Sequence, residues 1–413
     1  MAFITLLLYI FVIYIRPQEW VPAVYGWQLV DGLAILTVLF VALRASQTRR
    51  LVLSTPQNLL LLGFLVTIVL SHLSHTYFWG AYNSFITFSK HVIMFFLFVN
   101  VLDSEKKLKI SLWFIILLTV IMAIQGIYQF NNGFGWAGQP LTKTGRITWI
   151  GIFNDANDLA LALVMAIGFL LAFIFSRSGI FPKILSISLL AVLFNALYLT
   201  NSRGGYLALA ATMAFYFLRK FRNKIIAILI GGAFIFAIFV LGPSRLSEIS
   251  ATEGSAYGRI DAWYEGIQML KNSPLFGVGY GMFTDEFQRT AHNSFVLVAA
   301  EEGLIGLFFW VALIYACFKG LSILKKKSPQ LINYTAGLEA SLFGFMSSAF
   351  FLSRSYKPIL YIMLALASSF IYTYLKKEDY AFNSKDIRIA GLLSIGILFV
   401  AWITMRVSLR MVG

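Results

Sequence analysis

The sequence of 413 residues is poor in charged side chains, which make up 12% of it, and it contains a single cysteine, Cys317. One cysteine excludes a disulfide framework and a metal site built from several thiolates. So few charges, together with 59% apolar residues and a mean hydropathy of +0.79, exclude a chain that is mainly surrounded by water. Polar blocks long enough for a separate soluble domain are also missing. These absences indicate a polytopic membrane protein with one integral domain over residues 1–413.

Apolar runs recur along the whole chain at the length that crosses a bilayer, roughly 20 residues. They predict an all-α bundle of about 12 or 13 transmembrane spans, with a large periplasmic loop that contains short helices. The first run, MAFITLLLYIFVIYI, lacks the basic start and small-residue cleavage site of a signal peptide, so we expect it to remain in the membrane. The predicted spans are residues 1–15, 24–43, 57–72, 85–101, 110–130, 158–176, 182–200, 205–218, 225–242, 295–318, 333–351, 358–375 and 388–405.

Lysine and arginine are distributed unevenly between the two predicted sides. Twenty of the 33 lie in loops on one side, twelve lie on the opposite side, and Lys90 lies within a span. Because cytoplasmic loops retain positive charge, the crowded side is predicted to be cytoplasmic and the loop of residues 243–294 periplasmic. The net charge of +15 has the same origin, together with attraction to anionic lipid headgroups, and does not indicate nucleic acid. The outer cations are not needed for topology and could receive an anion.

Two outer segments combine cations with aromatic or small residues. NSRGGYLAL places Arg203 at the start of a span beside two glycines, although a single arginine at a helix end also serves as an interfacial anchor. SAYGRIDAWYEGIQMLKNSP predicts a helix that starts near Arg259 and stops before Pro274. Trp263 lies one turn after Arg259, so a cation and an aromatic ring share one helix face. An interfacial amphipathic helix is an equal alternative for this segment.

The stretch PLFGVGYG contains Gly277, Gly279 and Gly281 and predicts a tight backbone turn. Glycine lets another group approach the backbone closely. That group is either a substrate or another part of the chain, and the sequence leaves both interpretations open.

The stretch AHNSFVLVAAEEGLIG, residues 291–306, carries titratable groups directly into an apolar run. His292 lies just outside the run, and Asn293 is predicted to cap the helix that follows. A lone loop histidine is more often a structural residue than a catalyst. Glu301 and Glu302 point to different sides of a helix, so at least one of them must face the protein interior or a polar cavity.

Four motifs, SRGG, GR with Trp four residues later, NSPLFGVGYG and HNSFVLVAAEEGLIG, follow one another within residues 150–310. Together they resemble the O-antigen ligase and Wzy-type polymerase superfamily of bacterial envelope glycosyltransferases. GIFNDANDLA is similar to an Asn-rich segment of that family, although Ala156 stands where the family commonly has Pro.

The resemblance implies that a glycan is transferred from an undecaprenyl-pyrophosphate carrier to an acceptor hydroxyl at the periplasmic face of the bacterial inner membrane. It implies inversion and a reaction without a metal or another cofactor. His292 would be the general base, and Arg203 and Arg259 would stabilise the pyrophosphate by hydrogen bonds. Asn293 and Glu301 would orient the imidazole or brace the helix start. The implied substrate-binding residues are Asn293, Glu301, Gly277, Gly279, Gly281 and Trp263.

The partners implied are the lipid-linked donor, membrane lipids and an acceptor hydroxyl on lipid A core, on another glycan or on a protein. A polymerase stays open, because YIRPQEW resembles the opening of some exopolysaccharide-associated members. A non-enzymatic transporter of lipid-linked glycans is a further alternative, but the sequence shows no two repeated halves. A membrane scaffold would need no convergent polar groups. A membrane hydrolase is disfavoured, because no Ser-His-Asp grouping with a nucleophile elbow is present.

Overall fold

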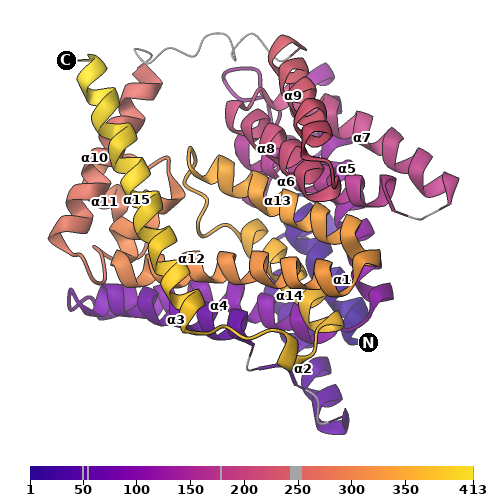
Figure 1. Ribbon diagram of the computed structural model, residues 1–413, viewed down its shortest axis with the longest axis horizontal. Coiled ribbons are helices and arrows are strands. Elements are labelled where there is room, and N and C mark those ends of the chain that lie inside the picture. Colours follow the sequence, from indigo (N-terminus) through magenta and orange to yellow (C-terminus); the bar gives the residue numbers. More distant parts are fainter. Residues whose placement is uncertain (49–50, 54, 177–178, 242–253, 413) are drawn as a thin grey trace.

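The computed structural model describes residues 1–48, 51–53, 55–176, 179–241 and 254–412. Regular structure in these ranges is helical, apart from one isolated bridge between Phe134 and Pro140, which confirms the all-α prediction (Figure 1). The α-helices are α1 (Ala2–Ile15), α2 (Leu29–Thr48), α3 (Pro56–Leu73), α4 (Phe78–Val101), α5 (Glu105–Asn132), α6 (Ala156–Ile174), α7 (Ile180–Thr200), α8 (Arg203–Lys220), α9 (Lys224–Leu241), α10 (Gly254–Asn272), α11 (Phe283–Phe287), α12 (Ser294–Lys327), α13 (Ile332–Ala349), α14 (Pro358–Tyr374) and α15 (Ser384–Val412).

Each predicted span overlaps a helix, although the ends differ: α2 begins five residues after its predicted start, and several helices extend beyond the predicted ends. Among the described residues, eight helices are long and apolar enough to cross a membrane, namely α2, α3, α4, α5, α6, α7, α12 and α15. Shorter apolar helices are α1, α14 and the first part of α9. A multi-pass membrane protein is therefore confirmed, whereas the larger number of 12 or 13 crossings stays a prediction.

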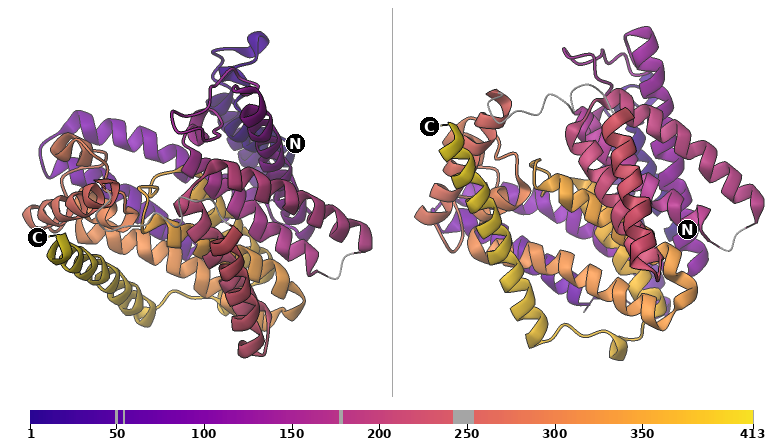
Figure 2. Two further views of the ribbon diagram at one scale, coloured as in Figure 1. Left: turned by 90° about the horizontal axis from the view of Figure 1, so that it is seen from above. Right: turned by 45° about the horizontal axis from the view of Figure 1, so that its top comes forward.

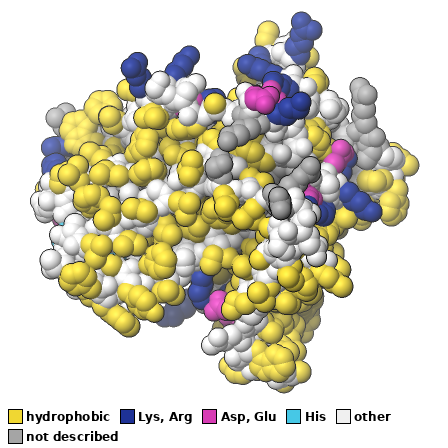
Figure 3. Space-filling view, turned by 90° about the horizontal axis from the view of Figure 1, so that it is seen from below, with side chains coloured by type: hydrophobic (Ala, Val, Ile, Leu, Met, Phe, Trp, Pro, Cys, Tyr) yellow, Lys and Arg dark blue, Asp and Glu magenta, His cyan; other side chains and the backbone are white. Residues whose placement is uncertain are grey.

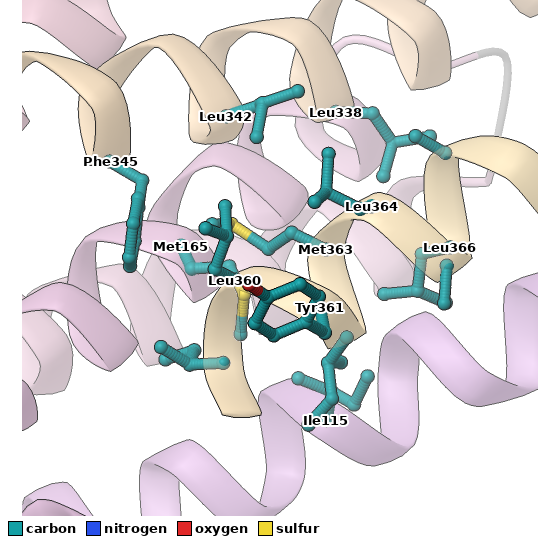
Figure 4. Packing of buried hydrophobic residues seen from close by; sticks show 14 of the residues in the cluster. Ile115, Met165, Leu338, Leu342, Phe345, Leu360, Tyr361, Met363, Leu364 and Leu366 are labelled. Carbon is teal, nitrogen blue, oxygen red and sulfur yellow. The ribbon is translucent and has the colours of Figure 1, made fainter. Parts of the chain in front are cut away.

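Two apolar helices, α6 and α14, form the centre of the bundle. Almost every side chain of α6 is buried, as is the stretch of α14 from Ile359 to Ile371. Their neighbours include α13, and Figure 4 shows Leu360, Tyr361 and Leu364 packed among side chains of the surrounding helices. A helix that is buried on all sides needs apolar side chains on every face, whereas a surface helix needs them on one face only. The sequences of α6 and α14 are of the first kind.

The outer helices present apolar side chains away from the protein. On α2 these include Ile35, Leu39 and Leu43, and on α15 they include Leu392 and Ile395. A space-filling view shows a broad apolar face with Lys and Arg mainly toward its edges (Figure 3). Such a continuous apolar surface suits contact with lipid chains.

Ion pairs join segments that the sequence predicts on the same side of the membrane. Those on the predicted inner side are Arg44–Asp103, Arg219–Glu339, Lys319–Asp386 and Lys327–Asp379, and those on the predicted outer side are Arg354–Asp155, Arg354–Asp158 and Lys357–Asp158. This grouping agrees with the predicted alternation of the loops. The orientation of the bundle itself stays a prediction.

The long segment after α9 contains α10 and α11. Its residues 242–253, which include Arg245, lie outside the described residues. The helix expected to start near Arg259 begins five residues earlier, at Gly254, and ends before Pro274 as predicted. It packs against α12 and α15 (Figures 1 and 2). The predicted periplasmic position of residues 243–294 is not tested by this packing and stays a prediction.

The sequence predicts one regular helix over residues 295–318, and this is wrong in one respect. α12 is interrupted at Gly303, where φ is 66° and ψ is −169°. A Cβ at Gly303 would lie 2.3 Å from the carbonyl carbon of Leu275, so the approach of another backbone segment requires a glycine there.

At the interruption of α12, backbone N–H and C=O groups lose their partners within the helix and bind the segment 274–279 instead. Four hydrogen bonds connect them: Val278 N–H to Ala300 O (2.9 Å), Gly279 N–H to Glu301 O (3.0 Å), Leu304 N–H to Pro274 O (2.9 Å) and Ile305 N–H to Leu275 O (3.4 Å). Buried backbone groups must be paired, and these bonds pair them at the break. The glycine-rich turn is thereby attached to α12 at residues 300–305.

Candidate functional site

His292 lies in a short corner between α11 and α12. Its backbone has φ 49°, a left-handed conformation that is uncommon for a residue other than glycine. The His292 N–H donates to Thr290 Oγ1 at 3.4 Å, and the Thr290 hydroxyl in turn donates to Ser353 Oγ. Its side chain is half-buried. Strained conformations of this kind persist only where the surroundings fix them, and they concentrate at functional sites.

Asn293 caps α12, as the sequence predicts. Its side-chain oxygen accepts hydrogen bonds from the backbone N–H groups of Phe295 (2.9 Å) and Val296 (3.1 Å). The Asn293 side chain is fully buried, so its observed role is to start the helix. This cap places the imidazole of His292 immediately outside the apolar run. Substrate binding by Asn293 stays a prediction.

The loop between α13 and α14 holds the same corner from the other side. Ser294 Oγ donates to Leu352 O at 2.6 Å and accepts from the Arg354 N–H at 2.8 Å. Ser355 Oγ donates to Ser294 O at 3.0 Å. The histidine corner is thus attached to a loop some 60 residues later in the chain.

Arg354 extends this attachment to the start of α6. Its guanidinium forms ion pairs with Asp158, through Nε, and with Asp155, through Nη2 at 3.2 Å. Lys357 Nζ lies 3.5 Å from the other oxygen of Asp158. The side chains of Arg354 and Asp158 are only 13% and 8% exposed, so water screens this interaction weakly.

The start of α6 is joined in turn to the start of α8. Asn157 Oδ1 accepts hydrogen bonds from Ser202 Oγ (2.7 Å) and from Arg146 Nη2 (2.9 Å). Ser202 also caps α8 by accepting from the Gly205 N–H at 3.0 Å. Arg203 is the first residue of α8 and therefore lies at this junction.

Several charged groups act on the His292 imidazole. Burial lowers the pKa of His292, and the positive charges of Arg259 and Arg354 lower it further. The negative charge of Asp155 raises the pKa of His292, and the positive charge of Arg289 lowers it. The structure therefore brings Arg259 of α10 into the electrostatic surroundings of His292. Arg203 lies at the junction of α6 and α8, and its share in the site stays a prediction.

Arg289 is a cation of this site that sequence reasoning missed. It lies three residues before His292, its side chain is exposed, and its Nη1 atom would be 2.9 Å from a Cβ added at Gly258. Arg289 therefore lies beside the residue that precedes Arg259. Charges on α10 and on the histidine corner thus converge.

Trp263 is covered by other side chains. It is 4% exposed and makes an edge-on contact with Phe350, with ring centroids 5.4 Å apart. It belongs to a satellite apolar cluster with Phe283 and Val296 that packs α10 onto the start of α12. A direct contact of Trp263 with substrate stays a prediction, and the contacts observed are those of packing.

The three glycines of the turn have different surroundings. At Gly277 (φ 70°) a Cβ would lie 2.3 Å from the carbonyl carbon of Glu301, and at Gly279 (φ 115°) one would lie 3.0 Å from His72 Nδ1. Gly281 (φ 77°) faces open space. Gly277 and Gly279 thus permit close packing of the chain itself, and Gly281 leaves room beside the backbone. Substrate binding by all three stays a prediction.

Glu301 and Glu302 are both buried, with 2% and 0% of their surface exposed. This confirms that at least one of them faces the protein interior. Glu301 Oε1 accepts a hydrogen bond from the Phe283 N–H at 3.1 Å and so braces the chain that follows the glycine turn. Its participation in substrate binding stays a prediction.

Comparison with known proteins finds similarity to a family over part of the chain. Residues 188–311 match the family model for O-antigen ligase, and they include Arg203, Arg259 and His292. The match to the O-antigen ligase model covers this part of the chain, and the residues before and after it lie outside the match. The resemblance expected from the four motifs is confirmed over this stretch. The remaining groups around the site, Arg354, Lys357, Asp155 and Asp158, lie outside the matched residues.

Two curated relatives come from Rickettsia conorii and Rickettsia felis, and both are named provisionally as polysaccharide ligases. Each is 25% identical to this chain, over 299 and 297 residues respectively. The similarity covers 64% of this chain and 69% of each relative. Together with the O-antigen ligase domain, these names support a membrane-bound polysaccharide ligase of the O-antigen ligase type.

The ion pairs of Arg354 could not be found from the motifs, because Arg354, Lys357, Asp155 and Asp158 come from two distant segments. One signal was present in the sequence. Asp155 and Asp158 are three residues apart at one predicted span end, and Arg354 and Lys357 are three residues apart at another. Both span ends lie on the same predicted side of the membrane, and residues three apart share a helix face.

Proposed function

We propose that this chain transfers a glycan from an undecaprenyl-pyrophosphate carrier to an acceptor hydroxyl at the periplasmic face of the bacterial inner membrane. The observation that carries the proposal is the position of His292. It is held in a strained conformation just outside α12, among the charges of Arg259, Arg289, Arg354 and Asp155. The O-antigen ligase domain and the names of the two relatives supply the reaction class.

The proposed step is a single displacement at the anomeric carbon of the donor sugar. The acceptor oxygen forms a bond to this carbon while its proton moves to the neutral imidazole of His292. The bond between the anomeric carbon and the pyrophosphate oxygen breaks, and undecaprenyl pyrophosphate leaves with the electron pair. Attack opposite to the leaving group inverts the configuration. Because burial and neighbouring cations lower the pKa of His292, the imidazole is neutral and able to accept a proton near pH 7.

The leaving pyrophosphate gains negative charge as the bond breaks. We assign its binding to Arg203 and Arg259, whose planar guanidinium groups make paired hydrogen bonds to phosphate oxygens. Arg289 is a third candidate, since it is exposed beside the same histidine. In the part of the chain that is described, no group of three or more His, Cys, Asp or Glu is placed to hold a metal ion. A metal-free reaction is part of the proposal.

The remaining residues divide into two groups by their surroundings. Gly281 has open space beside its backbone and is the best placed of the three glycines for contact with a sugar. Asn293, Glu301, Gly277, Gly279 and Trp263 make contacts within the protein. We propose that they act on the substrate indirectly, by fixing the histidine corner and the turn.

The acceptor distinguishes the possible products. A ligase joins the glycan to lipid A core, a polymerase joins it to another carrier-linked repeat, and a protein-directed enzyme joins it to a hydroxyl side chain. A strain that lacks this protein separates the first two. Unattached long chains on the carrier indicate a ligase, and products with a single repeat indicate a polymerase. A transporter would leave transfer by the purified protein undetectable.

The proposal is tested with purified protein, donor lipid and acceptor. Removal of a general base typically costs about 10²–10⁴ in rate, so His292→Ala should insert in the membrane and bind donor but transfer little glycan. His292→Gln keeps a hydrogen-bonding group that cannot take a proton at neutral pH, and it should be similarly impaired. Transfer by His292→Gln at close to the normal rate would show that His292 only positions the substrate.

A further inference from the structure

We propose that Arg354 is a positioning residue of this site, which holds the His292 corner in a fixed relation to the start of α8. Its backbone binds the first residue of α12, and its side chain binds the carboxylates ahead of and within α6. The inference rests on the proposed function for its consequence in catalysis. Its structural part stands on the described contacts alone.

The contacts of Arg354 form a continuous connection between two proposed catalytic residues that are far apart in the sequence. From His292 the chain passes to Ser294, whose hydroxyl accepts the Arg354 N–H at 2.8 Å. The Arg354 guanidinium then binds Asp155 and Asp158.

The connection continues along the outer end of α6. Asn157, between the two aspartates, accepts the Ser202 hydroxyl at 2.7 Å. Ser202 is the cap residue of α8 and directly precedes Arg203. A displacement of the α13–α14 loop would therefore move the proposed base relative to a proposed phosphate-binding arginine.

The charges of this connection favour positioning over phosphate binding by Arg354. Two carboxylates, Asp155 and Asp158, already face its guanidinium, and only 13% of its side chain is exposed. An arginine neutralised in this way attracts a pyrophosphate weakly. It instead ties three segments together, and a buried ion pair is costly to break because one charge is then left without its partner.

His292 provides a local measure of whether the connection is intact. Charged groups reach it from each neighbouring segment: Arg259 from α10, Arg289 from the residues before the corner, Arg354 from the α13–α14 loop and Asp155 from the start of α6. Arg354 lowers its pKa and Asp155 raises it. Variants of these two residues should therefore move the titration of His292 in opposite directions.

The first experiment measures the His292 titration without any transfer reaction. Diethyl pyrocarbonate modifies neutral imidazole, so its rate at His292, resolved by peptide mass spectrometry on the full chain in detergent, reports the ionisation of this residue. Arg354→Gln should move the titration to higher pH and Asp155→Asn should move it to lower pH. Asp155 is 47% exposed, so the second variant should fold even if the first does not. Unchanged titration in both variants would overturn the proposal.

The second experiment measures transfer, with a matched ion pair as control. Arg219 pairs with buried Glu339 at the predicted inner end of α8. Arg354→Gln should lower kcat about tenfold or more with little change in KM, and Arg354→Lys should recover part of it. Arg219→Gln should lower thermal stability but leave kcat and the His292 titration unchanged. Equal loss of kcat in Arg354→Gln and Arg219→Gln, at equal loss of stability, would show a purely structural role.

The two experiments separate this inference from the proposed function. If His292→Gln transfers normally while the titration shifts are observed, the general-base assignment is wrong and the connection through Arg354 stands. If His292→Gln is inactive while the titration does not shift, the assignment of the base stands and the positioning role of Arg354 is wrong.

Discussion

Ion pairs of the same kind occur at the predicted inner end of α8 and, on the predicted outer side, at the start of α6, in different surroundings. At the predicted inner end, Arg219 binds Glu339 through two nitrogens and Ser322 through one of them. Glu339 is completely buried, and the pair joins α8 to α13. A lysine, Lys325, donates a hydrogen bond to the backbone oxygen of Arg219, and both residues of the pair lie within regular helices. Its role is therefore accounted for by packing and by the pairing of a buried charge.

At the predicted outer end, Arg354 also pairs with buried carboxylate, but its neighbourhood differs in two respects. It borders His292, a half-buried base in a strained conformation, and further cations, Arg259 and Arg289, act on the same imidazole. Ion pairs alone thus do not mark a functional site. A strained base beside several cations is what we expect of a site that binds an anionic substrate, and on this ground we propose the outer end as the functional one.

The largest expected effect concerns the side of the membrane on which each of these two groups of ion pairs lies. A reporter fused within residues 243–290 should be periplasmic, and one fused within residues 319–328 should be cytoplasmic, because Lys and Arg are retained on the cytoplasmic side. Alkaline phosphatase and a fluorescent protein, which are active on opposite sides, measure this directly. The reverse result at both positions would place the proposed site on the cytoplasmic side and overturn its assignment.

The next largest effect concerns the arginines. Arg259→Lys keeps the charge but loses the planar pair of donors, so transfer should fall about 10-fold to 100-fold. Arg203→Lys should behave similarly. Arg219→Lys, at the other end of α8, is the control and should leave transfer unchanged. If Arg259→Lys turned over normally, the residue would be better described as an interfacial anchor.

A smaller effect is expected from the glycines behind the site. Gly303→Ala should lower the free energy of unfolding by about 2 kcal/mol or more, because its Cβ would collide with the backbone of Leu275. Gly281→Ala has open space and should cost only about 1 kcal/mol for its left-handed backbone. Thermal unfolding followed by tryptophan fluorescence in detergent compares the two. Equal destabilisation would argue against the tight approach of residues 274–279 to α12.

The smallest effect concerns pH. The proposed base must be neutral, so transfer should rise with pH as His292 loses its proton. Since burial and the charges of Arg259 and Arg354 lower its pKa, the midpoint should lie below about 6.5, the value of an unperturbed histidine. Initial rates at saturating substrate, measured from acid to neutral pH, give the midpoint. A midpoint well above this value would contradict the described electrostatics.

The sequence predicted helices well because the length of an apolar run is a local property. Each of the predicted spans overlaps a helix, and Asn293 caps α12 as expected. The motifs also predicted Arg259 and His292 in one site; the positive charge of Arg259 lowers the pKa of His292, and their shared role in catalysis stays a prediction. The sequence did not disclose the break at Gly303, since glycine occurs in many regular membrane helices and only the approach of Leu275 distinguishes this one.

The sequence by itself determined that the chain is an apolar helical bundle, that its cations are concentrated in alternate loops, and that His292 directly precedes a span. These features depend on residues close together in the chain. Only the tertiary structure decided that Arg354 binds Asp155 and Asp158, and that Trp263 is covered by Phe350. The physical reason is that ion pairs and packing depend on distance in space. The residues involved are some 90 to 200 positions apart, and no local pattern specifies which helix ends meet.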